Sequence, residues 1–317
     1  MIDVNDVSMK FPRALKPVFE EVTFTVGEGA IAPLIGSNGA GKTTLLRIIA
    51  GIISPATGSV SIKGADPTLE LGVAQRDIGL SLYPERSFYF RLTSRQNLEY
   101  FASLRGLFGK QARAEADRTL CMVGLEEKAD AMFMRMSLGQ RRRLGLARAL
   151  LCSPGVLLLD EPTANLDSTG SALVQGIIRE HAAAGGAVML STHHQQDLRL
   201  ATGPVLTLKG GQLTEVQSAA STLSRQVDIT FGSGDTSVVW SLAEKYPLTR
   251  TSDGVLLDVP LDVPLAAVIS ELSSLGVCIS SVIDGLWSMT TDSLTDEVSP
   301  VPTSAGDLVG AQEMGRA

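Results

Sequence analysis

Residues 36–43 read Gly36-Ser37-Asn38-Gly39-Ala40-Gly41-Lys42-Thr43, between the apolar run Ile31–Ile35 and the helical pattern Thr44–Ala50. This is a complete G-x-x-x-x-G-K-[ST] motif in the strand-to-helix setting that the motif requires. The glycines let backbone N–H groups turn inward, and the start of the helix adds a favourable dipole, so the loop is suited to cradling phosphates. We predict that Lys42 reaches the β- and γ-phosphates of a nucleotide and that the Thr43 hydroxyl holds Mg²⁺.

A second motif, Val156-Leu157-Leu158-Leu159-Asp160-Glu161, places two acids at the end of a strand that is apolar on both faces. We expect Asp160 to bind Mg²⁺, directly or through water, and Glu161 to polarise an attacking water. An Asp-Glu pair after a strand is by itself more often a solvated turn. The phosphate loop upstream is what favours the catalytic interpretation.

A third motif, Met136-Ser137-Leu138-Gly139-Gln140, precedes a helical pattern over Arg141–Leu151. Ser137 is a favourable N-cap residue, and Gly139 permits close approach of an anion to the start of the helix. Taken alone, this motif predicts only a capped helix.

Composition narrows the class of protein. The 317 residues are enough for two domains, and the net charge of -7 argues against a protein that holds nucleic acid by a broad basic surface. The three cysteines lie far apart without CxxC spacing, so we expect a reduced cytosolic setting and neither a metal site nor a disulfide framework. We see no signal peptide and no run near the ~20 apolar residues that cross a bilayer, so other chains would have to span any membrane.

The first two thirds of the chain alternate apolar runs with helical patterns, which indicates a largely parallel sheet. Strands are expected at Val22–Val26, Ile31–Ile35, Val156–Leu159 and Val188–Leu190, with a helical region over about residues 93–150. Past Gly210-Gly211 the pattern predicts a small α/β domain with its own core. Its expected strands are 226–231, 254–259 and 277–283, and its expected helices are 236–245 and 261–275.

These patterns divide the chain into a nucleotide-binding domain over residues 1–217, a linker over 218–224, and a C-terminal accessory domain over 225–298. Residues 299–317 are themselves dominated by Pro, Ser, Gly and Ala from about Pro300 onward, so we expect a disordered tail there.

Taken together, the motifs resemble those of ABC ATPases in order and spacing, over roughly Val4 to Leu213. The resemblance implies an α/β fold, with a P-loop NTPase (RecA-like) core, an antiparallel β subdomain, and a helical signature subdomain over about residues 84–150. Residues 136–140 resemble the LSGGQ signature, with Leu138 in place of a glycine and Met136 in place of the leucine. The sequence Ala164-Asn165-Leu166-Asp167 looks like the D-loop, which contacts an opposing subunit.

The resemblance also assigns roles to single residues. Lys42, Glu161 and His193 are the implied catalytic residues, His193 matching the switch histidine that bonds the γ-phosphate. Phe11 falls where the family stacks an aromatic ring on adenine, although core packing is an equal alternative. The neighbouring His194 has no family role and is interpreted as solvated. The remaining implied ATP contacts are Gly36, Ser37, Asn38, Gly39, Ala40, Gly41, Thr43 and Thr44, with Ser137, Gly139 and Gln140 acting on the nucleotide of a second subunit.

Two positions depart from the family pattern. Pro84 stands where the Q-loop glutamine is expected, and the adjacent Glu85 is our candidate for a substitute metal-sensing oxygen. Pro33 lies inside the strand that feeds the phosphate loop. Because proline forfeits a ladder N–H, it predicts a bulge or edge-like pairing at that point.

The segment Glu85–Thr93, followed by Gln96-Asn97-Leu98, resembles the exporter branch of the family. That branch is similar to ABC-2-type systems, whose membrane partner is a separate permease. Residues Asp292–Asp296 resemble a motif that ends the accessory domain of drug-export ATPases, or are equally a polar surface turn. The implied cofactors are ATP and Mg²⁺. The implied partners are a second copy or homologous nucleotide-binding subunit and an integral membrane permease, with no nucleic acid, at the cytoplasmic face of the membrane.

Two other classes stay open. One is an ABC ATPase working on ribosomes or DNA, disfavoured by the acidic balance and by the absence of a second nucleotide domain or a coiled-coil insertion. The other is a regulatory subunit that binds ATP without hydrolysing it, suggested only by the change at Pro84.

Overall fold

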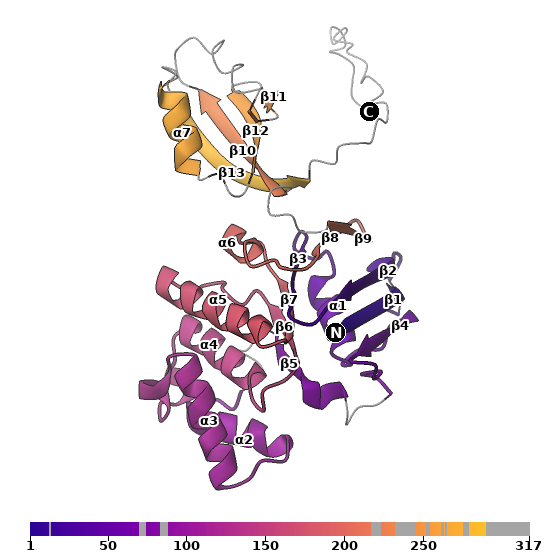
Figure 1. Cartoon of the computed structure of the whole chain (residues 1–317), viewed down its shortest axis with the longest axis vertical. Helices are drawn as coiled ribbons and strands as arrows, with labels where there is room; N and C mark the ends of the chain where they lie inside the picture. Colours follow the sequence, from indigo (N-terminus) through magenta and orange to yellow (C-terminus); the bar gives the residue numbers. More distant parts are fainter. Residues whose placement is uncertain are drawn as a thin grey trace, which may run out of the picture.

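A computed structural model describes residues 1–12, 14–69, 74–82, 88–216, 223–231, 245–246, 248–251, 254–260, 263, 265–274 and 279–289 (Figure 1). Several predictions lie outside these residues. They concern Pro84 and Glu85, most of the helix expected over 236–245, the acidic motif Asp292–Asp296, and the tail 299–317. Within the described residues, no helix is both long and apolar enough to cross a membrane.

A six-stranded sheet carries the motifs. Its order is β5-β6-β7-β3-β8-β9, and all neighbours are parallel except β8 and β9. The strands are β5 (Ile78–Ser81), β6 (Val156–Asp160), β7 (Ala187–Ser191), β3 (Ile31–Ile35), β8 (Val205–Lys209) and β9 (Gln212–Val216). The prediction of a largely parallel sheet is confirmed. Because the carboxyl ends of parallel strands meet at one edge, the segments after β3, β6 and β7 converge there.

This sheet lies between two hydrophobic cores, which explains its unbroken apolar runs. Along β6, Leu157 and Leu159 belong to a core shared with α4 (Leu138–Ala149) and α5 (Ser168–Ala183). Val156 and Leu158 belong to a second core. That core contains α1 (Lys42–Ile49) and a three-stranded antiparallel sheet, ordered β2-β1-β4.

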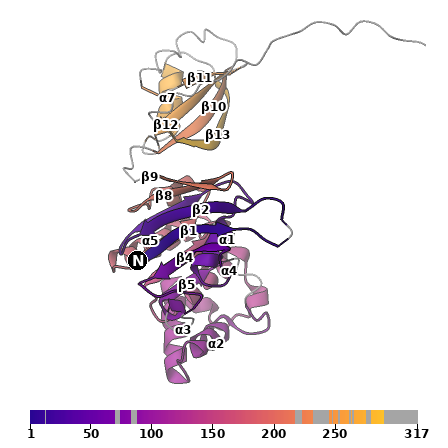
Figure 2. The same ribbon diagram turned by 90° about the vertical axis from the view of Figure 1, so that its right-hand side faces the viewer.

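The antiparallel sheet consists of β1 (Ile2–Met9), β2 (Phe19–Val26) and β4 (Thr57–Ile62), which lie side by side in Figure 2. In β2, Val22, Phe24 and Val26 are buried, and the residues between them are exposed. The half-buried strand expected over Val22–Val26 is therefore confirmed.

Pro33 occupies β3 without a shift of register against β7, where it pairs with Leu190. On the other side, β8 pairs with Leu34 and Ile35. Three residues before Leu34, the backbone of Ile31 bonds to Thr202 and Gly203 in the loop before β8. Of the two alternatives predicted for Pro33, the structure therefore has edge-like pairing, and the missing N–H falls where the β8 ladder has not yet begun.

The helical region expected over residues 93–150 contains α2 (Ser94–Leu104), α3 (Lys110–Met122) and α4, with short 3₁₀ turns at Glu126–Lys128 and Phe133–Arg135. The start of α2 is fixed by a capping box between Thr93 and Gln96. A further 3₁₀ turn, Ala74–Asp77, precedes β5, and the short helix α6 (Gln195–Leu198) follows β7.

The C-terminal residues form a four-stranded antiparallel sheet, ordered β11-β12-β10-β13, and a helix. The elements are β10 (Leu223–Phe231), β11 (Leu248–Arg250), β12 (Gly254–Pro260), α7 (Leu265–Ser274) and β13 (Ile279–Met289). Val227, Leu257, Val268 and Leu272 are among the residues of its own core.

Three expectations for this region are corrected. The linker expected over 218–224 is too long, because β10 already begins at Leu223, which pairs with Met289. The helix expected from residue 261 begins at Leu265, and β11 was not expected at all. The early start of β10 depends on pairing with the distant Met289, which local patterning does not encode, whereas β11 forms a hairpin with the neighbouring β12.

Candidate functional site

The phosphate loop follows β3 and ends at Lys42, the first residue of α1. Two glycines are required by the fold. A Cβ on Gly36 would lie 2.5 Å from the backbone oxygen of Leu208, and Gly41 has a φ of +108°. The Lys42 ammonium donates to the backbone oxygens of Gly36 (2.6 Å) and Ser37 (3.0 Å), which holds it over the loop.

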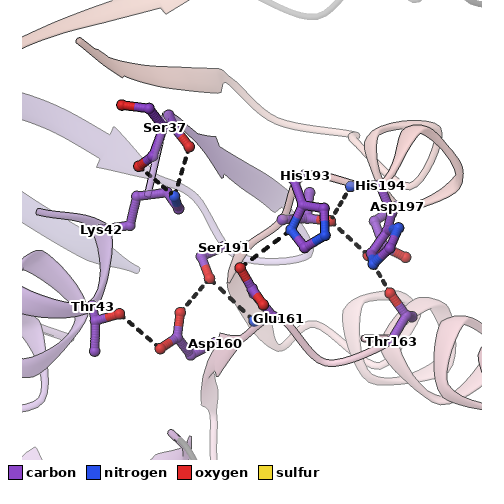
Figure 3. Close-up of polar contacts among 12 residues, drawn as sticks. Ser37, Lys42, Thr43, Asp160, Glu161, Thr163, Ser191, His193, His194 and Asp197 are labelled. Atoms are coloured by element: carbon purple, nitrogen blue, oxygen red, sulfur yellow. Dashed lines mark hydrogen bonds and ion pairs between the residues drawn. The ribbon is translucent and has the colours of Figure 1, made fainter. Parts of the chain in front are cut away.

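Asp160, at the end of β6, is the meeting point of two hydroxyls (Figure 3). Thr43 Oγ1 donates to one carboxylate oxygen at 2.8 Å, and Ser191 Oγ donates to the other. Among the described residues, no group of three or more His, Cys, Asp or Glu side chains gathers in a way that could hold a metal. The adjacent oxygens of Thr43 and Asp160 nevertheless fit Mg²⁺, which usually takes one or two carboxylates and completes its shell with phosphates and water.

Glu161 points away from Asp160 and toward His193, whose Nδ1 lies 3.2 Å from Glu161 Oε1 (Figure 3). The Glu161 backbone has a φ of +49°, a conformation that L residues rarely adopt. Four bonds hold it there. Its N–H donates to the backbone oxygen (3.0 Å) and Oγ (3.1 Å) of Ser191, and its carbonyl accepts from Arg142 (3.0 Å) and from the Ala164 N–H (3.2 Å). Strained residues of this kind persist only where the surroundings determine them, typically at functional sites.

A pocket of about 760 Å³ joins these groups. Its lining contains Gly36, Ser37, Asn38, Gly39, Gly41, Lys42, Thr43, Thr44, Asp160, Glu161, His193, Val18 and Phe11. Phe11 is 41% exposed at this pocket, so it does not pack in the core. Ala40 is the loop residue that packs against a hydrophobic core instead.

The signature residues lie elsewhere on the described chain. Ser137 and Gln140 form a capping box at the start of α4, as the N-cap prediction required. Neither they nor Gly139 lines the 760 Å³ pocket, and Gln140 lines a different one. A Cβ on Gly139 would lie 3.2 Å from Leu166 Cδ2, so this glycine packs against the segment that resembles the D-loop.

Sequence reasoning missed two residues that hold the site together. Ser191, fully buried, bonds both Asp160 and Glu161, and Arg142, in α4, donates to the carbonyls of both acids. An arginine on the buried side of an amphipathic helix was the available signal for the second. The solvated state expected for His194 is wrong. Its ring is half-buried, with a centroid 4.1 Å from that of His193, and its Nε2 is shielded from solvent.

Comparisons with known proteins agree with this geometry. Residues 19–164 match the family model described as ABC transporter. The chain is 30% identical to the daunorubicin resistance ATP-binding protein DrrA3 of Streptomyces coeruleorubidus, over 83% of this chain and 85% of that protein. It is 34% identical to the Fe(3+) ions import ATP-binding protein FbpC of Rhizobium etli, over 62% of this chain and 55% of that protein.

Among solved structures, the fold resembles the dimeric post-hydrolysis state of the ATP-binding cassette MJ0796 bound to ADP and Pi. The TM-score is 0.64 at 26% identity, over 68% of this chain and 98% of that one. The phosphate loop, Asp160, Glu161 and His193 thus line one pocket of a chain whose relatives are ATP-binding proteins. The chain belongs to the ABC transporter ATP-binding proteins and is an ABC ATPase.

Proposed function

We propose that this chain powers export through a separate ABC-2-type membrane permease, by pairing with a second nucleotide-binding subunit around two ATP molecules. The observation that carries the proposal is the separation of Ser137, Gly139 and Gln140 from the pocket of their own phosphate loop. The N-terminus of α4, with its Ser-x-Gly sequence, is suited to binding an anion. Its proposed ligand is therefore the phosphate of a nucleotide held by the second subunit. The dimeric form of the MJ0796 cassette supports this pairing.

Each residue of the pocket has a role in the proposed hydrolysis. The loop N–H groups and Lys42 bind the phosphates, and Thr43 with Asp160 would hold Mg²⁺, which when bound neutralises phosphate charge. Glu161 orients the attacking water and accepts its proton. His193, bonded to Glu161, donates to the γ-phosphate. Phe11 stacks on the adenine.

Two further observations support the proposal that the direction of transport is export and that the membrane partner is of the ABC-2 type. The first is the likeness of Glu85–Thr93 to the exporter branch. The second is the reach of the DrrA3 alignment: at 83% of the chain it must extend past residue 217 into the C-terminal elements, whereas the FbpC alignment covers 62%. We place the subunit at the cytoplasmic face of the membrane through its permease. The net charge of -7 disfavours nucleic acid as a partner.

The test of the hydrolytic pairing is Glu161→Gln, which keeps the shape of the side chain and removes its basicity. Phosphate release should fall by at least about 100-fold, because general-base catalysis contributes roughly 10² to 10⁴ in rate. Size-exclusion chromatography with ATP should then show a stable dimer. The exposed Glu180→Gln in α5 serves as control and should retain both the turnover and the monomer–dimer behaviour of the unaltered chain.

Undiminished turnover in Glu161→Gln would reject Glu161 as the base, and a monomer at saturating ATP would reject the pairing. The direction of transport needs the permease. In vesicles that contain both subunits, with ATP on the side of this chain, cargo leaving that side supports export, and cargo arriving there rejects it.

A further inference from the structure

A buried carboxylate, that of Asp197, lies next to the catalytic pocket in α6, outside the sequence motifs described above. Asp197, in α6, is 0% exposed and accepts three side-chain hydrogen bonds. The donors are Thr163 Oγ1 at 2.6 Å, Thr192 Oγ1 at 2.8 Å and Gln175 Nε2 at 2.9 Å. The two hydroxyls share the Oδ2 oxygen, and the amide takes Oδ1. Thr163 and Asp197 are among the residues drawn in Figure 3.

Two of the three donors come from the segments that carry Glu161 and His193. Thr163 stands two residues after Glu161, and Thr192 stands one residue before His193. One oxygen of Asp197 therefore fastens together the two backbone segments whose side chains meet at 3.2 Å in the pocket. Gln175 belongs to the sixteen-residue helix α5, so the third bond ties this junction to a rigid element.

His193 needs such a tie because little else fixes it. Its side chain is 55% exposed and packs on the neighbouring ring of His194, which lies in the same segment without regular structure after β7. Its partner Glu161 has the rare φ of +49°. A shift of about 1 Å between groups that act on one reacting water can cost up to roughly 100-fold in rate.

Stability alone is a poor explanation for Asp197. Burying a carboxylate carries a large desolvation cost, and buried ionic groups are often replaced by apolar residues without loss of stability. The carboxylate has a geometric property that an apolar residue lacks: it accepts from several donors at once and sets the distance between them. Here the donors it joins are the neighbours of Glu161 and His193.

We propose that Asp197 is a positioning residue for ATP hydrolysis, which sets His193 against Glu161 by binding Thr192 and Thr163. The inference rests on the proposed function, in which Glu161 and His193 act on the γ-phosphate and the attacking water. Asp197 itself touches neither nucleotide nor water in this scheme. It acts on the rate through His193.

The decisive experiment is a double-mutant cycle on the full chain, measured by single-turnover phosphate release and by ATP binding. Asp197→Ala should lower the rate constant about tenfold while ATP affinity changes less than twofold, because the phosphate loop is untouched. On a His193→Ala background, Asp197→Ala should change the rate less than twofold. Asp197→Asn should recover most of the rate, since its oxygen can accept from both hydroxyls while Gln175 turns its amide to accept the new N–H.

Thr163→Val tests the same point without emptying the site, in case Asp197→Ala does not fold. It removes one hydroxyl donor and should lower the rate about threefold, with the loss again abolished by His193→Ala. Thr119→Val is the matched control, because it is the same change at a fully buried threonine in α3 whose hydroxyl donates to the backbone oxygens of Glu115 and Ala116. It should leave the rate unaltered.

The outcomes separate the two proposals. Equal losses from Asp197→Ala with and without His193 would overturn the positioning role and leave Asp197 as a purely structural residue. A loss of ATP affinity as large as the loss of rate would overturn it as well. If His193→Ala alone leaves turnover unchanged, the proposed role of His193 fails, and with it the scheme on which the inference rests.

Discussion

Replacing Ser191 with alanine tests the hydrogen-bond network under the two acids. Ser191 is fully buried; its hydroxyl donates to the Asp160 carboxylate and accepts from the Glu161 N–H at 3.1 Å. A hydrogen bond to a charged group contributes about 1.5–3 kcal/mol to stability, against about 0.5–1.5 kcal/mol for a neutral pair. The Glu161 N–H keeps a second acceptor in the Ser191 carbonyl at 3.0 Å, so the loss is confined to Asp160.

The expected destabilisation in Ser191→Ala is therefore about 2 kcal/mol, or a melting temperature lower by about 5 °C for a domain of this size. Function should suffer separately. Residues that orient a metal-binding carboxylate typically influence metal affinity 10- to 100-fold, so the Mg²⁺ concentration for half-maximal ATPase activity should rise by about tenfold.

The matched control is Ser94→Ala in α2. Ser94 is equally buried, but its hydroxyl donates to a backbone oxygen of Ala131 at 3.4 Å and to the Met136 sulfur at 3.3 Å, both neutral. It should lose no more than about 1 kcal/mol and show an unaltered Mg²⁺ requirement. The assays are thermal unfolding without nucleotide and phosphate release over a Mg²⁺ titration. Equal thermal shifts in the two variants, or a constant Mg²⁺ requirement in Ser191→Ala, would refute the network's role at Asp160.

Three shorter predictions follow from other parts of the chain. Burial lowers the pKa of His181, so below about pH 6.5 the unfolded chain takes up a proton more readily than the folded chain does. The free energy of unfolding therefore decreases as the pH is lowered, and His181→Gln should reduce the drop in melting temperature between pH 8 and pH 5.5. Gly79→Ala would put a Cβ 2.2 Å from the backbone oxygen of Ala149 and should lower the free energy of unfolding in urea by about 2–3 kcal/mol. Gly176→Ala, in open space on α5, should raise it by up to about 1 kcal/mol. Similar losses in both variants would contradict the close packing of β5 against α4. Phe11→Ala should weaken ATP binding about tenfold, since aromatic stacking on a base contributes about 1–3 kcal/mol, while Phe11→Trp retains it; calorimetry showing equal affinity for all three chains would exclude stacking.

Local pattern predicted the parts of the fold that are local. The strand-loop-helix context of residues 36–43 and the apolar run before Asp160 required only neighbours in sequence, and both stand in the structure where expected. The capping box at Ser137 is similarly a relation between residues three apart. Helix boundaries were less accurate, and α7 begins four residues later than its periodicity indicated.

Pairing between distant segments was beyond the sequence alone. The start of β10 at Leu223 depends on Met289, and the half-buried state of His194 depends on how the segment after β7 folds back toward α5. The identity of a single residue does not indicate which distant residue it will contact, because the type of side chain limits the kind of interaction and not its partner.

Short stretches of sequence were enough to predict the candidate site: a phosphate loop with Lys42 and Thr43, two acids after a buried strand, and a histidine after another. The contacts that hold these groups became visible in the folded chain. Ser191 bonds Asp160, Arg142 bonds the carbonyl of Glu161, and Asp197 bonds Thr192 next to His193. The physical reason is separation along the chain. Ser191 and Asp160 lie 31 residues apart, and Asp197 and Thr163 lie 34 apart. Such bonds exist only once the parallel strands bring their carboxyl ends to one edge of the sheet.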